Sequence, residues 1–299
     1  MTGGTPLLEL SNLEEKLGLR AKVLCKCEFM NPTGSAKDRA AREIVEDFEK
    51  KGLLKKGGVI VEATSGNTGI GLASVCAAKG YKAVIIMPDT MSEERIKLMR
   101  AYGAEVVLSD GKKGMTGSLE KVDEVKEKYP EALMAGQFVN PSNAMAHYKT
   151  TGPEIWEDTE GNVDIFVAGI GTGGTFTGTA RFLREKNRAL RAVGVEPASS
   201  PLLSKGIAGP HGLQGIGANF IPEVLDRSLL DEIMCITDEE AFETARMLGR
   251  CEGIMTGITS GAAVCASLKL AALPENEGKT IVTVLPDSGD RYLSGDLYG

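Results

Sequence analysis

Short apolar segments alternate with amphipathic segments along most of the chain, which is the pattern of alternating strands and helices. Residues 37–52 (KDRAAREIVEDFEKKG) repeat apolar residues at helical spacing from Ala40 to Phe48 and end at a glycine. The strands that follow are nearly continuous apolar runs bounded by Gly or Pro, as in parallel strands covered on both faces. The pattern predicts strands at 58–63, 82–87 and 104–109 and helices at 67–80 and 92–103.

The alternation resumes after residue 143 and continues almost to the end of the sequence. Residues 197–222 interrupt it with a Gly- and Pro-rich stretch without periodicity, and a loop of that length is usually functional. Thr237 and Glu240 form the signature of a capping box before a helix. The pattern predicts strands at 164–169, 191–196, 232–237 and 280–286, and helices at 174–185, after Thr237, and from about Ser260. We therefore expect an α/β protein of two intimately joined units.

Composition narrows the functional classes. The sequence has 34 Lys and Arg against 41 Asp and Glu, a formal charge of −7, which argues against a nucleic-acid or anionic-membrane partner. No apolar run approaches the roughly 18 residues of a membrane span, and the first residues lack the pattern of a signal peptide. The six cysteines show no metal-site spacing. We expect a cytoplasmic protein with reduced thiols, no metal site and small-molecule partners.

A first candidate ligand site is TSGNTG (64–69), which lies between a predicted strand and a predicted helix. Its small residues expose backbone N–H groups at the positive end of a helix, where an anion can bind. Hydroxyl and amide side chains add further donors. The alternative is an ordinary turn in which Ser or Thr caps the helix.

A second candidate is GIGTGGT (169–175), again between a strand and a helix. Gly169, Gly171 and Gly174 fit G-x-G-x-x-G, and Glu196 ends the next predicted strand, as a dinucleotide fingerprint requires. The motif encodes a phosphate at a helix N-terminus and does not distinguish a dinucleotide from another phosphate ester. A dinucleotide site, another phosphate site and a structural turn all remain open.

A third candidate is Lys37, which begins a helix after the turn NPTGSA. A lone lysine is usually a solvated charge. Two anion sites and a candidate amine in one chain fit a lysine that forms a Schiff base with pyridoxal phosphate better than they fit hydride transfer.

Seven segments resemble the cysteine synthase (O-acetylserine sulfhydrylase) family in order and spacing. This family is part of the pyridoxal-phosphate β-family, fold type II, which is similar to the tryptophan synthase β chain. The resemblance implies two three-layer α/β units with mostly parallel sheets. It also implies a smaller, partly mobile domain at 31–140 and a larger domain formed by 1–30 and 141–299. The segments are KCEFMNPTGSAKDR (26–39), EATSGNTGIGLA (62–73), QFVNPSNAMAHYKTTGPEIW (137–156), GIGTGGTFTG (169–178), GPHGLQGIGANFIP (209–222), GIMTGITSGAA (253–263) and LPDSGDRYLS (285–294).

The resemblance also implies roles for individual residues. Lys37 resembles the lysine that bonds the cofactor and moves the proton, and Asn67 resembles the side chain that hydrogen-bonds the oxygen of the cofactor ring. The residues that resemble the phosphate-binding loop are Gly171, Thr172, Gly173, Gly174 and Thr175. Those that resemble the group binding the substrate carboxylate are Thr64, Ser65, Gly66, Thr68 and Gln137.

Two positions depart from the family pattern. Thr259 stands where cysteine synthases usually carry Ser facing the pyridine nitrogen, so a hydroxyl is retained. The alternative is that Thr259 or Ser260 caps the following helix. Asn219 replaces the usual glycine of GIGAGF in a loop near the leaving group. His147 and His211 lie in family segments and are expected to form structural hydrogen bonds.

The implied reaction is β-replacement: O-acetyl-L-serine loses acetate, an α-aminoacrylate remains on the enzyme, and sulfide adds to give L-cysteine. Related outcomes are the synthesis of cystathionine, lanthionine or cyanoalanine. An NAD-dependent oxidoreductase is the alternative from another class. The family is typically homodimeric, and its active site can accept the C-terminal tail of serine acetyltransferase.

Overall fold

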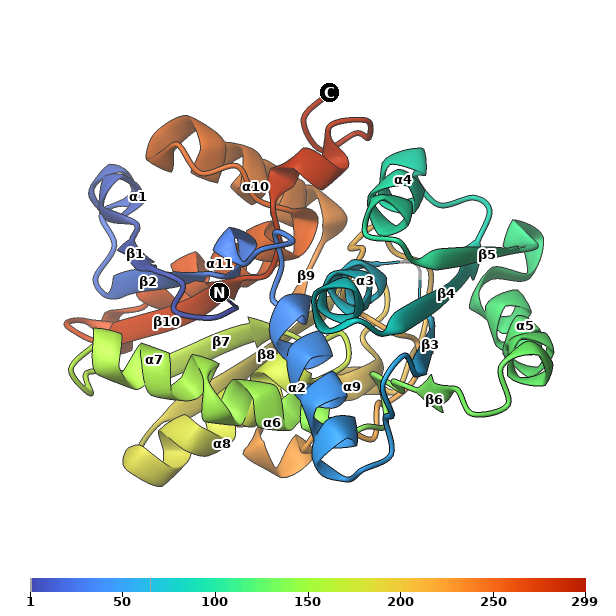
Figure 1. Ribbon diagram of the computed structural model, residues 1–299. Helices are drawn as coiled ribbons and strands as arrows, with labels where there is room; N and C mark the ends of the chain where they lie inside the picture. The colour runs from blue at the N-terminus through green and yellow to red at the C-terminus, as the bar shows by residue number, and fades with distance from the viewer. Residues whose placement is uncertain (1, 65) are drawn as a thin grey trace. The chain divides into compact units, whose positions relative to one another are not determined.

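The computed structural model describes residues 2–64 and 66–299, and contacts within the chain divide it into two units. One unit comprises Gly3–Ala36 and Ala144–Gly299, and the other comprises Lys37–Asn143. Each unit is built around its own sheet (Figure 1).

The first unit contains a six-stranded sheet in the order β1-β2-β10-β7-β8-β9. β1 pairs antiparallel with β2, whereas the other neighbouring pairs are parallel. Alternating side chains enter different cores: Val167 of β7 packs into one cluster and Phe166 into another. The strands are β1 (Leu7–Glu9), β2 (Lys22–Cys27), β7 (Ile165–Gly169), β8 (Arg191–Pro197), β9 (Glu232–Ile236) and β10 (Thr280–Leu285).

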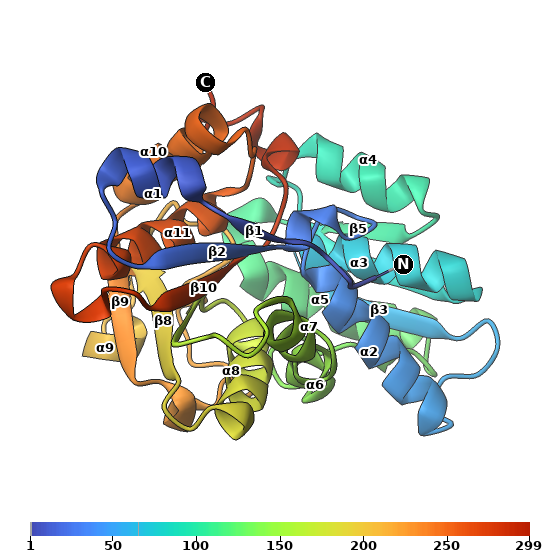
Figure 2. The ribbon, with the colours of Figure 1, turned by 90° about the vertical axis from the view of Figure 1, so that its left-hand side faces the viewer.

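Helices cover both faces of this sheet, which gives three layers (Figure 2). α1, α10 and α11 share a core with one face, and α7 and α8 share a core with the other. α11 is mostly apolar, and all of its residues except Lys269 are buried, as expected of a helix in the middle of a core. The helices are α1 (Ser11–Leu17), α6 (Ser142–Lys149), α7 (Thr151–Asp158), α8 (Gly174–Lys186), α9 (Leu202–Lys205), α10 (Asp238–Glu252) and α11 (Ile258–Ala271). α6 begins at the border of the two units.

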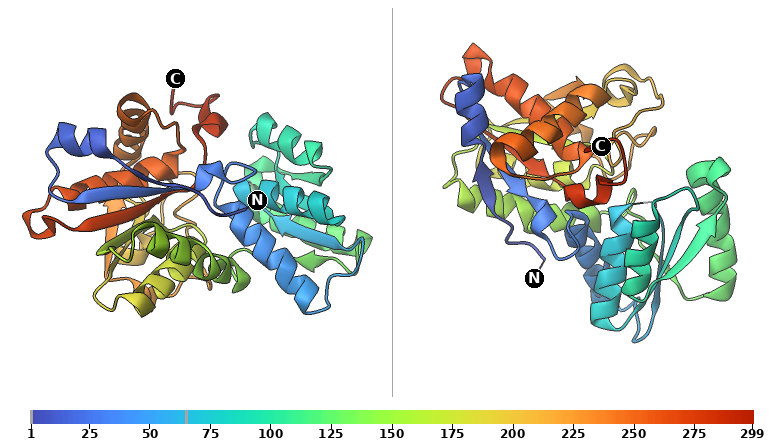
Figure 3. Two further views of the ribbon diagram at one scale, coloured as in Figure 1. Left: turned by 60° about the vertical axis from the view of Figure 1, so that its left-hand side comes forward. Right: turned by 90° about the horizontal axis from the view of Figure 1, so that it is seen from above.

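The second unit contains a parallel four-stranded sheet in the order β5-β4-β3-β6. Residues of α2, α3 and α4 share a core with one face, and Val122 and Val125 of α5 pack on the other (Figure 3). This unit is also three-layered. Its strands are β3 (Val59–Ala63), β4 (Lys82–Pro88), β5 (Glu105–Ser109) and β6 (Leu133–Met134), and its helices are α2 (Lys37–Lys50), α3 (Asn67–Lys79), α4 (Glu93–Ala101) and α5 (Gly114–Lys128).

The predicted α/β class with mostly parallel sheets is confirmed, and so is the capping box. Thr237 accepts a hydrogen bond from the N–H of Glu240, whose side chain accepts one from the N–H of Thr237. The helix predicted from Ser260 begins two residues earlier, at Ile258. The loop at 197–222 contains the four-residue helix α9, which carries no periodicity to detect.

Buried thiols contribute to both cores. Burial raises the pKa of the Cys27 and Cys76 thiols to about 12, so both are protonated at neutral pH. All six cysteines are free. Within residues 2–64 and 66–299, none of the helices combines the length and apolarity needed to cross a bilayer.

Candidate active site

Lys37 is the first residue of α2, and the packing of α2 on α3 fixes its position. Gly71 of α3 makes the close approach possible, because a Cβ there would lie 3.1 Å from the carbonyl oxygen of Lys37 and 3.2 Å from the Cβ of Ala41. The Lys37 side chain is half-buried. The start of α2 therefore lies beside the first turns of α3, which carry Asn67 and Thr68.

The turn before α3 presents the N-terminus of that helix. The N-cap is Gly66, which has no side chain to bind the first-turn amides. Thr64 instead turns its hydroxyl toward the turn itself and accepts a hydrogen bond of 3.3 Å from the N–H of Gly66. Ser65, predicted to bind the substrate carboxylate, lies outside the described residues. The positive end of α3 suits a carboxylate.

Gln137 joins this turn from a distant part of the sequence. Its side-chain oxygen accepts a hydrogen bond from the Thr68 hydroxyl, and its backbone oxygen accepts one of 2.8 Å from the Asn143 side chain. Gln137, Thr68 and Thr64 are each at least nine-tenths buried. Three of the residues predicted to bind a carboxylate thus lie in one buried cluster with Gly66.

Glu62 belongs to the same cluster and was missed by the sequence analysis. It lies on β3, and its carboxylate accepts hydrogen bonds from the N–H groups of Gly136 at 2.7 Å and Gln137 at 3.4 Å. The Gln137 side-chain amide also interacts with this carboxyl group and lowers its pKa. A signal was present, because Glu62 is the one charged residue in the apolar segment GVIVEA.

Burial dominates the electrostatics of Glu62. It raises the pKa of this carboxyl from 4.5 to about 7, against three hydrogen bonds that lower it. The pKa of Glu62 is higher in the folded state than in the unfolded state. Between about pH 4.5 and about pH 7 the native protein therefore keeps a proton on Glu62 that the unfolded chain has released. The free energy of unfolding therefore falls as pH rises from about 4.5 to about 7.

This shift gives a pH-dependent stability prediction. Relative to Glu62→Gln, wild-type protein should lose about 3 kcal/mol of unfolding free energy between about pH 5 and about pH 8, because only wild type must ionise a buried group. Urea unfolding of both proteins across this range measures the difference. A difference that does not change with pH would contradict the assignment.

In the other unit, residues 171–175 connect β7 to α8, and this loop packs closely against Gly215 and Leu225. A Cβ on Gly171 would lie 2.1 Å from the carbonyl oxygen of Gly215, and Gly173, with φ of +82°, would place a Cβ 2.7 Å from that of Leu225. The α8 N-cap is Gly173, without a side-chain cap. A glycine loop at an uncapped helix N-terminus, with Thr172 and Thr175 adding hydroxyls, fits a phosphate group.

His147 forms a hydrogen bond with this loop. Its Nε2 lies 3.1 Å from the Thr175 hydroxyl and its Nδ1 lies 2.8 Å from the Thr151 hydroxyl. His211 is bonded through Nε2 to the backbone oxygen of Gly217 at 2.8 Å. Both histidines thus form the structural hydrogen bonds expected of them. No group of three metal-ligating side chains is present among the residues that the structure describes.

Thr259 is buried near the start of α11. The N-cap of α11 is Gly257, and no side chain caps the helix there. The alternative in which Thr259 or Ser260 serves as the cap is therefore wrong.

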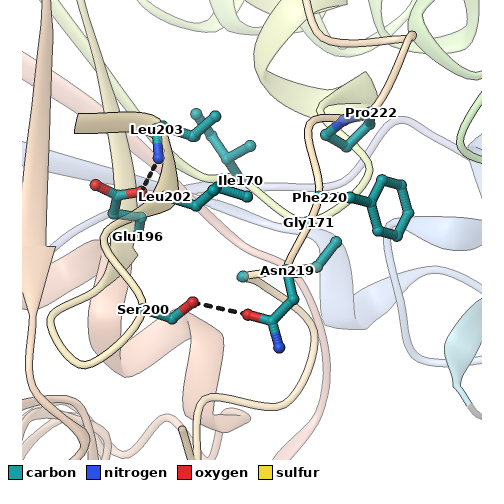
Figure 4. A pocket seen from close by; sticks show the side chains of 11 residues that line it. Ile170, Gly171, Glu196, Ser200, Leu202, Leu203, Asn219, Phe220 and Pro222 are labelled. Carbon is teal, nitrogen blue, oxygen red and sulfur yellow. Dashed lines mark hydrogen bonds between the residues drawn. The ribbon is translucent and has the colours of Figure 1, made fainter. Parts of the chain in front are cut away.

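Glu196 has a different role from the one that a dinucleotide fingerprint assigns to it. Its carboxylate accepts hydrogen bonds from the N–H of Leu203 at 2.7 Å, the N–H of Ser204 at 3.1 Å and the Ser204 hydroxyl. Glu196 is 2% exposed and holds the start of α9 beside a small pocket next to Gly171 (Figure 4). Both oxygens are used within the protein, which argues against the dinucleotide alternative, in which Glu196 would be the acidic residue of the fingerprint.

Asn219 lines the same pocket with a left-handed backbone, φ +60°. Asn tolerates this conformation better than most residues other than Gly, which explains how it can replace a glycine. The Ser200 hydroxyl donates a 2.7 Å hydrogen bond to Asn219 Oδ1 and accepts one of 3.1 Å from the N–H of Gly209 (Figure 4). Asn219 thus ties two parts of the long loop together.

Comparisons with known proteins identify the family. A family model described as "Pyridoxal-phosphate dependent enzyme" matches residues 1–287. Cysteine synthase A of Escherichia coli (strain K12) is 49% identical over 305 residues, covering 99% of this chain and 93% of that protein. A crystal structure of cysteine synthase from Entamoeba histolytica has a TM-score of 0.96 at 48% identity and covers 99% of this chain and 88% of that one.

A crystal structure of O-ureido-L-serine synthase is also similar, with a TM-score of 0.94 at 44% identity, covering 99% of this chain and 93% of that one. The match to curated cysteine synthases extends over nearly the full length on both sides. The chain therefore belongs to the cysteine synthase family of pyridoxal-phosphate-dependent enzymes.

Proposed function

We propose that this chain joins O-acetyl-L-serine and sulfide to give L-cysteine and acetate, with pyridoxal phosphate as cofactor. The observation that carries the proposal is the 49% identity, over 99% of the chain, to a curated cysteine synthase A. The glycine loop before α8 and the buried polar cluster before α3 support it, because one suits a phosphate and the other a carboxylate.

The residues present fit the cofactor. Gly171, Thr172, Gly173, Gly174 and Thr175 would hold its phosphate, since Gly171 and Gly173 let the loop pack closely on Gly215 and Leu225 before the uncapped N-terminus of α8. Lys37 would bond it, Asn67 would hydrogen-bond its ring oxygen, and Thr259 would face its ring nitrogen. Pyridoxal phosphate supplies an electron sink for charge that develops at the substrate α-carbon. A neutral hydroxyl at Thr259, in place of a carboxylate, would limit protonation of the ring nitrogen and so favour elimination at the β-carbon.

The chain's own groups would then perform three tasks. Thr64, Ser65, Gly66, Thr68 and Gln137 bind the substrate carboxylate at the positive end of α3. Lys37 would take the α-proton on Nζ. Movement of the smaller domain, 31–140, closes the site and excludes water during the reaction.

Assembly and location belong to the same proposal. We infer a homodimer that works in the cytoplasm, where its six free cysteines remain reduced. The binding site for the substrate carboxylate would also accept the carboxylate at the C-terminal tail of serine acetyltransferase. Titration with such a tail peptide, followed by cofactor fluorescence, tests this partner.

Parallel reactions with different donors and nucleophiles test the proposed activity. Purified holoenzyme should form cysteine from O-acetylserine and sulfide much faster than it forms cystathionine, lanthionine or cyanoalanine with serine or cysteine as the donor. Amino-acid analysis of parallel reactions measures each product. A preference for one of these other products would replace the proposed reaction with a related β-replacement.

A further inference from the structure

Gln137 would bind the substrate carboxylate through its side-chain amide. This amide can adopt two orientations, which exchange the positions of its oxygen and its nitrogen. Its oxygen and nitrogen are nearly the same size, so either could face Thr68. The amide can donate to a carboxylate only through its nitrogen, and the wrong orientation would present a lone pair to a negative charge.

Glu62 removes this ambiguity. In the structure the Thr68 hydroxyl donates to the Gln137 side-chain oxygen, which leaves the amide nitrogen for Glu62. Ionised Glu62, the form that prevails above its pKa of about 7, only accepts hydrogen bonds and therefore favours this orientation of the amide. One N–H of the Gln137 amide is then used by Glu62, and the second remains for a ligand. Glu62 thereby determines which atom of Gln137 is available.

The same carboxylate fixes the backbone that carries Gln137. It accepts hydrogen bonds from two successive N–H groups, those of Gly136 and Gln137, immediately after β6. Gly136 has φ of +65°, and its carbonyl oxygen accepts hydrogen bonds from the N–H groups of Val139 and Asn140. The turn that presents Gln137 is therefore closed around Glu62.

No cation competes for this carboxylate. Glu62 is 3% exposed, and no Lys, Arg or His side chain pairs with it in the part of the chain covered by the structure. Its bonds to Gly136 and Gln137 lie in a dry environment, where charge-assisted hydrogen bonds are strong. Burying the Glu62 carboxylate costs free energy, and the hydrogen bonds from Gly136 and Gln137 offset part of that cost.

We infer that Glu62 is a positioning residue for substrate binding: it orients the Gln137 amide and its turn so that an N–H faces the amino-acid carboxylate. This inference rests on the proposed function. Glu62 touches no substrate atom in this account and acts through Gln137.

The kinetics of a Glu62→Gln variant test the inference. A glutamine at this position has one acceptor oxygen, whereas the N–H groups of Gly136 and Gln137 and the Gln137 side chain all interact with Glu62. Loss of a charge-assisted hydrogen bond should lower kcat/KM for O-acetylserine about 10- to 100-fold, mainly by raising KM. The value of kcat/KM for sulfide should change less than about threefold, since sulfide carries no carboxylate to be bound. The bound cofactor's visible spectrum should be unchanged.

A double-mutant cycle separates positioning from general damage. In a Gln137→Ala background, adding Glu62→Gln should change kcat/KM for O-acetylserine less than about threefold, because the residue through which it acts is gone. Glu105→Gln is the matched control. Glu105 lies on β5 of the same sheet and accepts hydrogen bonds from Lys128 and Tyr129 at the surface, so its kinetics should match wild type.

Glu62→Asp provides a second test should Glu62→Gln prove unstable, because it keeps the charge but retracts the carboxylate by one methylene. It should also raise KM for O-acetylserine. An unchanged kcat/KM in either folded variant, or fully additive effects with Gln137→Ala, would overturn the inference. Absence of cysteine formation by wild type would instead count against the proposed function.

Discussion

A Lys37→Ala variant is expected to form cysteine at least about 1,000-fold more slowly than wild type, because it lacks both the amine that bonds the cofactor and the base that moves the α-proton. Lys37 is half-buried at the start of α2, and its backbone is packed on Gly71 of α3. Alanine keeps the helix. The loss should therefore appear in activity without a comparable loss of stability.

Two measurements check this result. Borohydride should attach the cofactor irreversibly to wild type and not to Lys37→Ala, as read by mass spectrometry of the denatured protein. Lys50→Ala is a matched control, since Lys50 ends the same helix and is exposed. Full activity in Lys37→Ala, or attachment of the cofactor at another lysine, would remove Lys37 from the mechanism.

Gly171→Ala is expected to weaken cofactor binding about 10- to 100-fold, since overpacking typically costs about 1–3 kcal/mol. The new Cβ would lie 2.1 Å from the Gly215 carbonyl oxygen, which is backbone and cannot rotate away. The loop before α8 must therefore shift, and the amides that would hold the phosphate shift with it. Equilibrium dialysis, with the cofactor measured by its absorbance, gives the affinity.

Gly249→Ala is the matched control for this substitution. Gly249 lies inside α10 of the same unit with its nearest contact at 3.9 Å, so alanine there should leave cofactor affinity unchanged. It should stabilise the protein slightly, by up to about 1 kcal/mol, through helix propensity. Equal cofactor affinity in the two alanine variants would mean that the glycine loop does not hold the phosphate.

The local pattern of apolar and polar residues was sufficient to predict most of the helices and strands. Most buried strands are continuous apolar runs, and most helices that cover them have an apolar face. The local pattern was insufficient for α5 (Gly114–Lys128), whose sequence is mostly polar and begins with glycines. Among the α5 side chains that the structure describes, Val122 and Val125 pack into the core, and their role depends on a sheet that the local sequence does not show. β6, with two residues, is too short to leave a pattern.

The candidate site shows the same limit. The glycines of 169–175 and the polar residues of 64–69 could be predicted as candidate anion sites from their place between strand and helix, and the carboxylate role of 64–69 came from the family resemblance. The function of Glu196 could not be predicted in this way. A G-x-G-x-x-G motif followed by an acidic residue is equally compatible with an acidic residue that holds a neighbouring helix. Glu62 acts on Gln137 across 75 positions of sequence, through the pairing of β3 with β6. Such a contact exists only in the folded protein.

Bound pyridoxal phosphate and its reaction with the amino-acid donor can be tested together by the absorbance spectrum of the purified protein, recorded before and after addition of O-acetylserine without sulfide. We expect a visible band from the bound cofactor that changes on addition of O-acetylserine and returns when sulfide is supplied, with cysteine formed in equal amount. A protein without a visible band, or a band that O-acetylserine leaves unchanged, would contradict the assignment of this chain as a pyridoxal-phosphate enzyme that makes cysteine.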